Sequence, residues 1–548
     1  MLQTLTDVTD EELEKIAKPS VDTLNNLCSS IDNIKRFIGI TPYNTNMNSL
    51  QKSINIYPNL INDAYIKQDI YNRKNYLVRE FKSGKLQIHG KYTFVLPDLY
   101  AACQHWFCAV KNPKGLLADG EVFCWLFRKD EKLDCLRSPH LYKEHAVRKN
   151  LACNSFENKQ KQLREWFCTN AVYTSCHDLI TKICMNDCDG DKYLLVGDKF
   201  FVEIVERNMK DIVPLYYNMK KAPSTILNNN AFFNGLKTAF KYSNIGIYSN
   251  NITKIWNSEV FINGTEEEKQ KAIDTVKLLC LENNFCIDAA KTLYMPERPK
   301  QVTEQISYYT KSQVPHFFKY AKDKDNSQVA TINNSIVNRL DNIIPNPRLN
   351  FRKLDVGKVD YRLLMKNPDI KFAITVNKNG QLIEKGTEPL VFDFCQKSHT
   401  YHFDLDRRKY SYEKDIEKLN AFKKKLQSDI AKQTKEEMLK YGYSESDTAD
   451  ILIKYFYGFR STTKHKTLLW NCYGDVIYEN LISNLSNKTK NKTAHKTKSI
   501  QCEDCGEWIE VSKYSNAKRC VDCQNINNRI KKTLRQRKYR NKIKSNRI

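Results

Sequence analysis

Apolar positions in the first 85 residues recur at roughly helical spacing among polar ones. Leu50, Ile54 and Leu60 give an imperfect apolar face, and Ser30 lies where a helix cap is expected. After residue 86 the pattern shortens into the runs KLQIHGKYTFVLPDL and GEVFCWLFR, which are typical of strands bounded by Gly and Pro. The runs KYLLVG and KFFVEIVER indicate further strands after an acidic turn. These patterns predict a helical region followed by a β-rich domain.

Helical spacing returns after residue 216. The run TEEEKQKAIDTVKLLCLEN begins at Thr265, a plausible N-cap, and places Val276 and Leu279 on one face. The run FAITVNKNGQLIEKG contains Asn379-Gly380, which predicts a β-hairpin. We expect seven regions: helical at 1–85, β-rich at 86–215, helical at 216–310, mixed α/β at 311–400, helical at 401–484, a polar linker at 485–500, and a cysteine-containing basic end at 501–548.

The composition indicates a globular protein with a polyanionic partner. The 548 residues include 88 Lys and Arg against 63 Asp and Glu, a net charge of +25, and 41% are hydrophobic. That hydrophobic content suffices for packed cores and excludes a wholly disordered chain. A large positive surplus usually indicates a nucleic-acid partner. A solvated basic surface, or a lysine-rich genome bias, is the alternative.

Nothing in the sequence predicts a membrane segment or export. No apolar run reaches the length of about 18 residues that a membrane span needs. The start, MLQTLTDVTDEELEKIAK, is acidic where a signal peptide is basic and then apolar. Most of the 18 cysteines are scattered singly, as in a reducing compartment. We therefore expect a cytoplasmic, intracellular protein.

The turn Asn186-Asp187-Cys188-Asp189-Gly190-Asp191 is a candidate metal site. Alternation along an extended loop directs Asp187, Asp189 and Asp191 to one side, and Gly190 permits a tight bend. Three neighbouring carboxylates repel one another unless a cation neutralises them, and oxygen ligands favour Mg²⁺ or Mn²⁺ over zinc. An EF-hand is a poor fit because no Glu closes a 12-residue loop. An acidic surface turn is the alternative.

Four cysteines near the end of the chain have the spacing of a zinc ribbon. Cys502 and Cys505 form one CxxC pair, and Cys520 and Cys523 form a second pair after fourteen intervening residues. Two such pairs supply four thiolates in tetrahedral geometry. Because four protein ligands leave no open position for water, we predict a structural Zn²⁺.

The last twenty residues form a strongly basic tail. They contain no acidic residue and ten basic ones: Arg529, Lys531, Lys532, Arg535, Arg537, Lys538, Arg540, Lys542, Lys544 and Arg547. Such a segment is typical of a phosphate-binding helix or arm. We take Arg535, Arg537 and Lys538 as candidate nucleic-acid contacts.

Three segments, in this order, resemble the catalytic half of the two-barrel RNA polymerases. They are Leu136-Arg137-Ser138-Pro139-His140-Leu141-Tyr142, the NDCDGD turn at 186–191, and CIDAAKT at 286–292. In that superfamily an Arg-x-Pro loop and a DxDGD loop belong to one double-psi β-barrel. The resemblance spans roughly residues 85–300. Phage-encoded single-subunit RNA polymerases look most similar, together with the cellular RNA-dependent RNA polymerases of silencing.

The resemblance implies an α+β fold, with a double-psi β-barrel catalytic domain embedded in helical regions and followed by the zinc ribbon and basic tail. It implies that Asp187, Asp189 and Asp191 hold the catalytic Mg²⁺ for transfer of ribonucleotides to an RNA 3′ end. The partners would be a template, most simply DNA, the RNA product and ribonucleoside triphosphates. Arg137 matches a residue that contacts the nucleotide sugar, and Lys291 one that contacts the nucleic-acid backbone. His140 would be structural or face nucleic acid.

One part of the family pattern is missing from the sequence. The polymerases need a second barrel that supplies basic residues to the triphosphate, whereas the first 85 residues here look helical. We therefore expect either the catalytic half of a split, phage-encoded polymerase acting in a bacterial host with a partner chain, or a truncated remnant. The alternatives in other classes are a non-catalytic zinc-ribbon DNA-binding protein and a Mg²⁺-dependent nuclease.

Overall fold

The computed structural model describes residues 1–545 apart from 138–139, 156, 216, 218–223, 243, 372–388, 412–415, 460–462, 464, 494–496 and 513–514. Within helices and strands, the side chains at 290–291, 389, 402–424, 459, 488–498, 510, 512 and 537–545 also lie outside this description. The chain divides into two compact units. The first unit combines Met1–Leu27 with Asn72–Leu349, and the second combines Cys28–Tyr71 with Asn350–Ile548.

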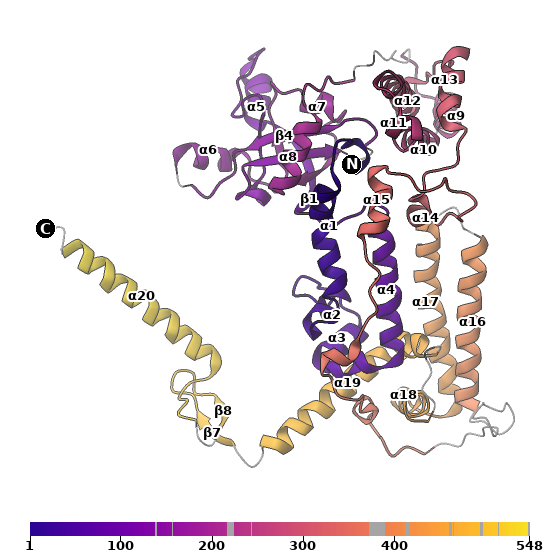
Figure 1. Ribbon diagram of the computed structural model, residues 1–548. Helices are drawn as coiled ribbons and strands as arrows, with labels where there is room; N and C mark the ends of the chain where they lie inside the picture. The colour runs from indigo at the N-terminus through magenta and orange to yellow at the C-terminus, as the bar shows by residue number, and fades with distance from the viewer. Residues whose placement is uncertain are drawn as a thin grey trace. The chain divides into compact units, whose positions relative to one another are not determined.

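A closed six-stranded β-barrel forms part of the first unit (Figure 1). Its strands are β1 (Gly90–Pro97), β2 (Glu121–Phe123), β3 (Lys132–Arg137), β4 (His145–Asn150), β5 (Val172–Thr174) and β6 (Lys192–Val196). The order around the barrel is β1-β5-β2-β4-β3-β6, and β6 pairs back to β1. The pairs β1·β5 and β2·β4 are parallel, and the other four pairs are antiparallel. The mixed α and β content and the barrel agree with the expected class of fold.

The barrel forms because alternate side chains of its strands meet in one apolar interior. Val95, Val122, Leu133, Val172 and Leu195 are fully or almost fully buried there. Along β1, Tyr92 and Phe94 are exposed while Thr93 and Val95 are buried, which is the alternation expected for a strand with one solvated face.

Several helices contact the barrel. They are α5 (Leu99–Cys108), α7 (Ile180–Ile183) and α8 (Lys199–Asn208), and α6 (Asn158–Trp166) shares a core with residues of β2 and β5. Helices α1 (Asp10–Asn25) and α15 (Ile336–Ile343) pack on each other in the same unit, and the boundary between the units falls within α4 (Ala64–Lys82). The strand predicted for KFFVEIVER is wrong, because these residues form α8. Asp198 caps this helix by accepting from the Phe201 N–H at 2.8 Å, and Phe201, Val202 and Val205 are buried on one face.

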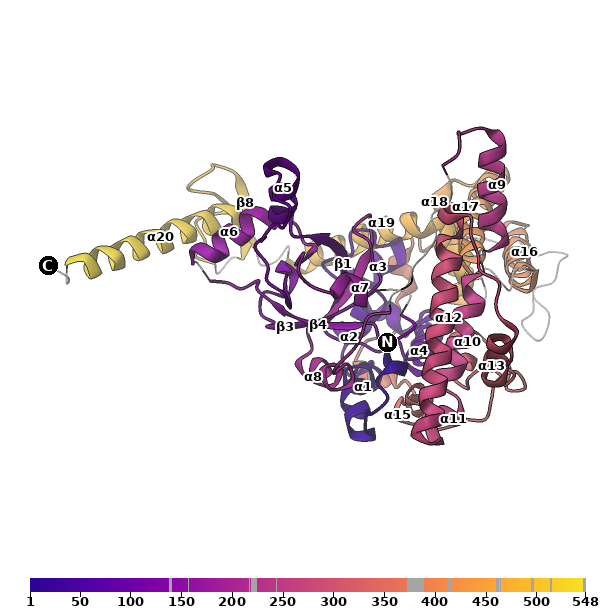
Figure 2. The ribbon, with the colours of Figure 1, turned by 90° about the horizontal axis from the view of Figure 1, so that it is seen from above.

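A helical group follows the barrel in the same unit. It contains α9 (Asn229–Lys241), α10 (Ile245–Trp256), α11 (Glu259–Asn263), α12 (Glu266–Thr292) and α13 (Lys300–Thr310), and α14 (Phe318–Ala321) comes next. Figure 2 shows α9 beside α12. The predicted cap is confirmed, since Thr265 and Glu268 form a reciprocal capping box at the start of α12. Val276 and Leu279 are fully buried against Ile252 and Ile255 of α10.

The second unit is mainly helical. Its helices are α2 (Ile31–Phe37), α3 (Ser49–Ile56), α16 (Pro389–Ser411), α17 (Ile416–Met438), α18 (Glu445–Ile453), α19 (Lys466–Thr493) and α20 (Val521–Ser545), and β7 (Thr497–Gln501) pairs with β8 (Trp508–Ser512). Ser30 caps α2 as expected. The predicted hairpin at Asn379-Gly380 falls outside the described residues. The predicted linker is not irregular throughout, because α19 continues to Thr493 across Lys, Asn and Thr with no Gly or Pro to end it.

No helix in the described part of the chain combines the length and apolarity needed to cross a bilayer.

Candidate active site and metal centre

The acidic turn at 186–191 joins α7 to barrel strand β6. Two residues of the connection adopt positive φ: Met185 at 50° and Gly190 at 132°. The conformation at Gly190 is one that L side chains rarely adopt, and no atom lies within 4 Å of where its Cβ would be. Glycine is therefore required here by backbone conformation, and the open space around it leaves room for a ligand.

Three side chains fix the path of this turn. Tyr193, buried in the barrel, donates its hydroxyl proton to Asn186, the residue before the first aspartate. Arg137 at the end of β3 donates to the Met185 carbonyl and lies 2.9 Å from Asp191 as an ion pair. Asp191 also accepts from the backbone N–H of Asp187 at 3.0 Å. The structure therefore brings Arg137 and the acidic turn together, and Arg137 pairs with the last carboxylate of the turn.

The three carboxylates are not gathered around one point. Asp187 and Asp189 are exposed and Asp191 is half-buried. Among the described residues, the four cysteines of the zinc ribbon are the one set of three or more potential ligands whose donor atoms all lie within 4.8 Å. The chemistry of the aspartates fits a hard divalent cation, since all three offer oxygen from one short turn. Their separation follows from mutual repulsion and from the pairing of Asp191 with Arg137.

The thiol of Cys188 is close enough to the three carboxylates to be affected by their charge. The pKa of this thiol is raised, first by burial and then by the negative charges of Asp187, Asp191 and Asp189. The turn is thus a local concentration of negative charge, which attracts cations.

A buried ion pair that the sequence did not reveal supports the segment leading to this turn. Arg148 of β4 donates to both carboxylate oxygens of Asp178, with one contact of 2.6 Å. Asp178 also accepts from the backbone N–H groups of Gly120 and Ile180, so it fixes the start of α7. Its side chain is 1% exposed. The residues lie 30 positions apart, and only the barrel register brings them together.

His140 lies in a second buried polar group, and it directly follows the Arg-x-Pro segment in the sequence. Both of its ring nitrogens are buried without a hydrogen-bond partner in the described structure, and its ring packs edge-on to His145 at 4.6 Å between centroids. His145 is 2.7 Å from Asp134, with both side chains fully buried. Burial lowers the pKa of His140 well below its usual value and raises that of Glu144 to about 7. This placement favours the structural role for His140.

The downstream motif ends a long helix near the acidic turn. Residues 286–292 form the last part of α12, and Asn284 on the same helix contacts the Met185 sulfur at 3.4 Å. The backbone of Lys291 therefore lies on α12, while its side chain is outside the described structure. Its predicted contact with nucleic acid stays a prediction.

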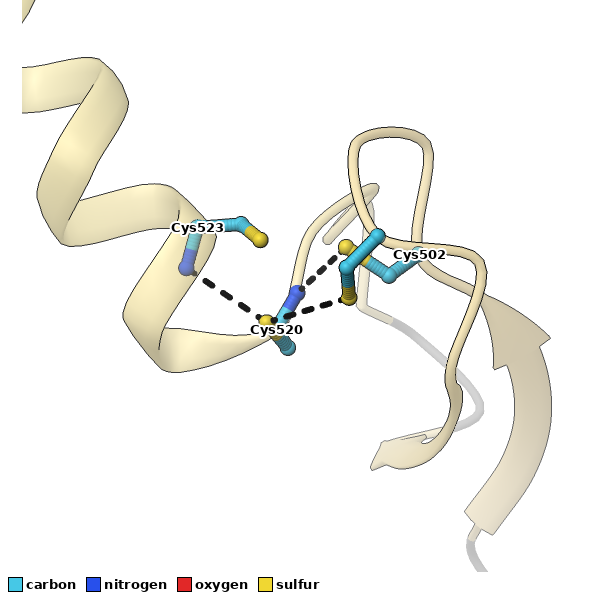
Figure 3. Close-up of side chains that lie close together, drawn as sticks. Cys502, Cys520 and Cys523 are labelled. Carbon is cyan, nitrogen blue, oxygen red and sulfur yellow. Dashed lines mark hydrogen bonds between the residues drawn. The ribbon is translucent and has the colours of Figure 1, made fainter.

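The four predicted zinc ligands converge (Figure 3). The Sγ atoms of Cys505 and Cys520 are 3.8 Å apart, and the Cys520 and Cys523 N–H groups donate to Cys502 and Cys520 sulfurs. The N–H groups of Cys520 and Cys505 lower the pKa of Cys502 to about 6. Backbone donors to sulfur favour the thiolate, which is the form that binds metal. This donor set fits zinc.

The basic tail forms helix α20, which starts at Val521, so that Cys523 lies in its first turn. Arg529, Lys531, Lys532 and Arg535 are exposed along it. Arg537 and Lys538 belong to the same helix, and their side chains lie outside the described structure. The helix therefore presents basic side chains to solvent directly after the predicted zinc site.

The closed barrel thus carries the acidic turn directly before β6 and Arg137 at the end of the neighbouring strand β3, and α12 ends in the IDAAKT segment. No family model matches the chain. The sequence is 40% identical over 521 residues to the DNA-directed RNA polymerase YonO of Bacillus phage SPbeta. That match covers 94% of this chain and 56% of the phage protein, so the chain spans little more than half the length of this curated relative.

Proposed function

We propose that this chain is the catalytic part of a phage-type DNA-directed RNA polymerase, adding ribonucleotides to an RNA 3′ end on a DNA template in a bacterial host. The observation that carries the proposal is the DxDGD turn on a closed barrel strand, within a chain 40% identical to a phage DNA-directed RNA polymerase over most of its length. We assign the barrel to the double-psi type, because two parallel pairings between strands distant in sequence lie within one closed sheet.

Asp187, Asp189 and Asp191 would hold the catalytic Mg²⁺. When bound, the cation would lower the pKa of the attacking 3′-hydroxyl and stabilise charge developing at the phosphate. Arg137 positions Asp191 and, through the Met185 carbonyl, the start of the turn. Its guanidinium is 23% exposed, so it also offers a donor to a nucleotide sugar at the same edge of the barrel.

A second barrel is expected to complete the site for the triphosphate. The six strands of the described first unit form one barrel, and the chain covers 56% of the length of its relative. We propose that a partner polypeptide or segment supplies the basic residues that contact the triphosphate. The zinc ribbon and α20 would contact nucleic-acid phosphates through Arg535, Arg537 and Lys538.

The test is Mg²⁺-dependent incorporation of labelled ribonucleotide on a primed DNA template, using the chain isolated from its host with whatever accompanies it. We expect Asp189→Ala to lower incorporation at least 10³-fold, on the order seen when a group that stabilises a transition state is lost. Asp119→Ala, which removes an exposed aspartate on another loop, is the matched control.

Three results would contradict the proposal. Equal incorporation by Asp189→Ala and the parent would remove the acidic turn from the chemistry. Absence of incorporation in the parent preparation, with DNA binding intact, would favour the zinc-ribbon binding protein. Metal-dependent cleavage of the labelled strand would favour the nuclease.

A further inference from the structure

Helix α9 (Asn229–Lys241) carries large apolar side chains but has no buried residue. Phe232, Phe233 and Leu236 are 60%, 63% and 71% exposed, and Ile226 and Leu227 just before the helix are exposed as well. Exposed apolar side chains are common singly, but a contiguous group of this kind usually marks a binding surface. We call Phe232, Phe233, Leu236 and Lys237 the α9 face.

The α9 face lies in a stretch of sequence without negative charge. No Asp or Glu occurs between Asp211 and Glu259, whereas Lys237 and Lys241 lie on α9 itself. Residues 233 and 237 are one turn apart, so the Phe233 ring and the Lys237 ammonium share one side of the helix, next to Phe232 and Leu236. An aromatic surface with lysines and no acid is complementary to a polyanion that also offers flat apolar groups.

Helix α9 lies in the first unit, which also contains the acidic turn and Arg137. It packs on α12 in the same unit (Figure 2). The backbone carbonyl of Tyr242, just after α9, accepts a hydrogen bond from the thiol of Cys286, the first residue of the CIDAAKT segment. Ile287 in that segment is also exposed. An exposed apolar side chain thus also occurs on α12, the helix on which α9 packs.

We propose that the α9 face binds an unpaired nucleic-acid strand by stacking bases on Phe232 and Phe233, with Lys237 contacting the backbone. The proposal deepens the proposed function and rests on it for the identity of the partner. Paired bases hide their faces within the duplex, so phenylalanine rings offer little to double-stranded DNA. A protein partner could also bind the exposed apolar side chains. It would not explain why the segment around them contains lysines and no acidic residue.

The experiment measures binding, and therefore does not depend on incorporation activity. The full chain is titrated with fluorescent oligothymidylate of about 20 nucleotides, and separately with a duplex of the same length, at about 50 and 200 mM salt. The double variant Phe232→Leu/Phe233→Leu keeps apolar area but removes both rings. The double variant Phe232→Trp/Phe233→Trp keeps rings. Tyr43→Leu removes a 93% exposed ring elsewhere and is the matched control.

We expect the leucine pair to bind the single strand on the order of tenfold more weakly at both salt concentrations, because stacking does not depend on counterion release. Duplex binding, which the basic tail can supply, should be unchanged, and the tryptophan pair and Tyr43→Leu should bind like the parent. Single-strand binding by the leucine pair equal to that of the parent would overturn the proposal and favour a protein partner. Equal losses for single strand and duplex would overturn it in favour of a general electrostatic effect.

These outcomes are distinguishable from failure of the proposed function. Inactivity of the chain in ribonucleotide incorporation would leave the binding comparison unaffected, whereas loss of ring-dependent binding would leave the acidic turn and its metal untouched.

Discussion

The cysteines at 502–523 and the aspartates at 187–191 are both short motifs of metal-ligating residues, but only the cysteines converge. The four sulfurs lie within 4.8 Å of one another, while Asp187 and Asp189 face solvent and Asp191 pairs with Arg137. Backbone N–H groups of the CxxC turns direct the sulfurs inward, and a thiol carries no charge until it is deprotonated. Three carboxylates at neutral pH repel one another. Local backbone geometry thus suffices to gather the four cysteines, whereas the proposed metal site at the aspartates would need a cation to gather its carboxylates.

Removal of zinc should give the largest effect, and it tests whether the cysteine site forms independently of the barrel. Cys520→Ser, or chelation of the parent, should reduce bound zinc from one per chain to none and unfold β7 and β8. Zinc binding in ribbons contributes about 10–16 kcal/mol of folding free energy at neutral pH. Metal analysis and hydrogen exchange measure both changes. Cys168→Ser, at an exposed cysteine outside the ribbon, is the control.

The barrel should retain its exchange protection in the chelated protein, because its core contains no metal ligand set in the described structure. Loss of protection in β1 or β6 would contradict the separation of the two sites.

Loss of the Arg148–Asp178 pair should be the next largest effect. Arg148→Ala leaves Asp178 buried and charged, which costs about 3–5 kcal/mol of unfolding free energy. Lys132→Ala breaks the exposed pair with Glu206 and should cost less than about 1 kcal/mol. Denaturant unfolding monitored by tryptophan fluorescence compares the two. A similar small cost for both would contradict a structural role for the buried Arg148–Asp178 pair.

The difference between local contacts and contacts made by strand pairing explains which features the sequence could predict. The convergence of the four cysteines, the strands at 90–97 and 192–196, and the cap at Thr265 depend on residues close together in the chain, and the structure confirms these features. Zinc binding by the cysteines stays a prediction. The pairs Arg148–Asp178 and Asp134–His145 depend on which strands become neighbours in the barrel. No short-range pattern contains that information.

The helix at 199–208 shows a different reason for failure. KFFVEIVER has β-branched and aromatic residues that suit a strand, but Asp198 supplies an N-cap and the apolar positions fit one helical face. The N-cap and packing against the barrel therefore favour a helix, and together they outweigh the strand propensity of these residues.

The buried carboxyl group of Glu144 should make the stability of the folded protein depend on pH. Burial raises its pKa to about 7 in the folded protein, above the value of 4.5 in the unfolded chain. Its contribution to stability is therefore full below pH 4.5 and is lost as the pH rises through 7. Glu144→Gln should remove this dependence and raise the unfolding free energy at pH 8 by up to about 3 kcal/mol relative to the parent.

Denaturation of parent and variant at pH 5 and pH 8 measures this difference. The exposed Glu165→Gln should leave the pH dependence unchanged. The same effect of Glu144→Gln on the unfolding free energy at both pH values would contradict the assignment of Glu144 as a buried carboxyl group with a raised pKa.

Arg137→Ala should give the smallest effect and bears most directly on why the aspartates stay apart. The guanidinium lies 2.9 Å from Asp191 and competes with a cation for that carboxylate. Because the pair is partly exposed, its removal should raise Mn²⁺ affinity by roughly fivefold, or about 1 kcal/mol. Arg137→Lys, which keeps the charge, should bind Mn²⁺ like the parent. Titration followed by electron paramagnetic resonance measures both. Weaker Mn²⁺ binding by Arg137→Ala would instead mean that Arg137 gathers the turn for the cation, so that the separation of the carboxylates would come from their mutual repulsion alone.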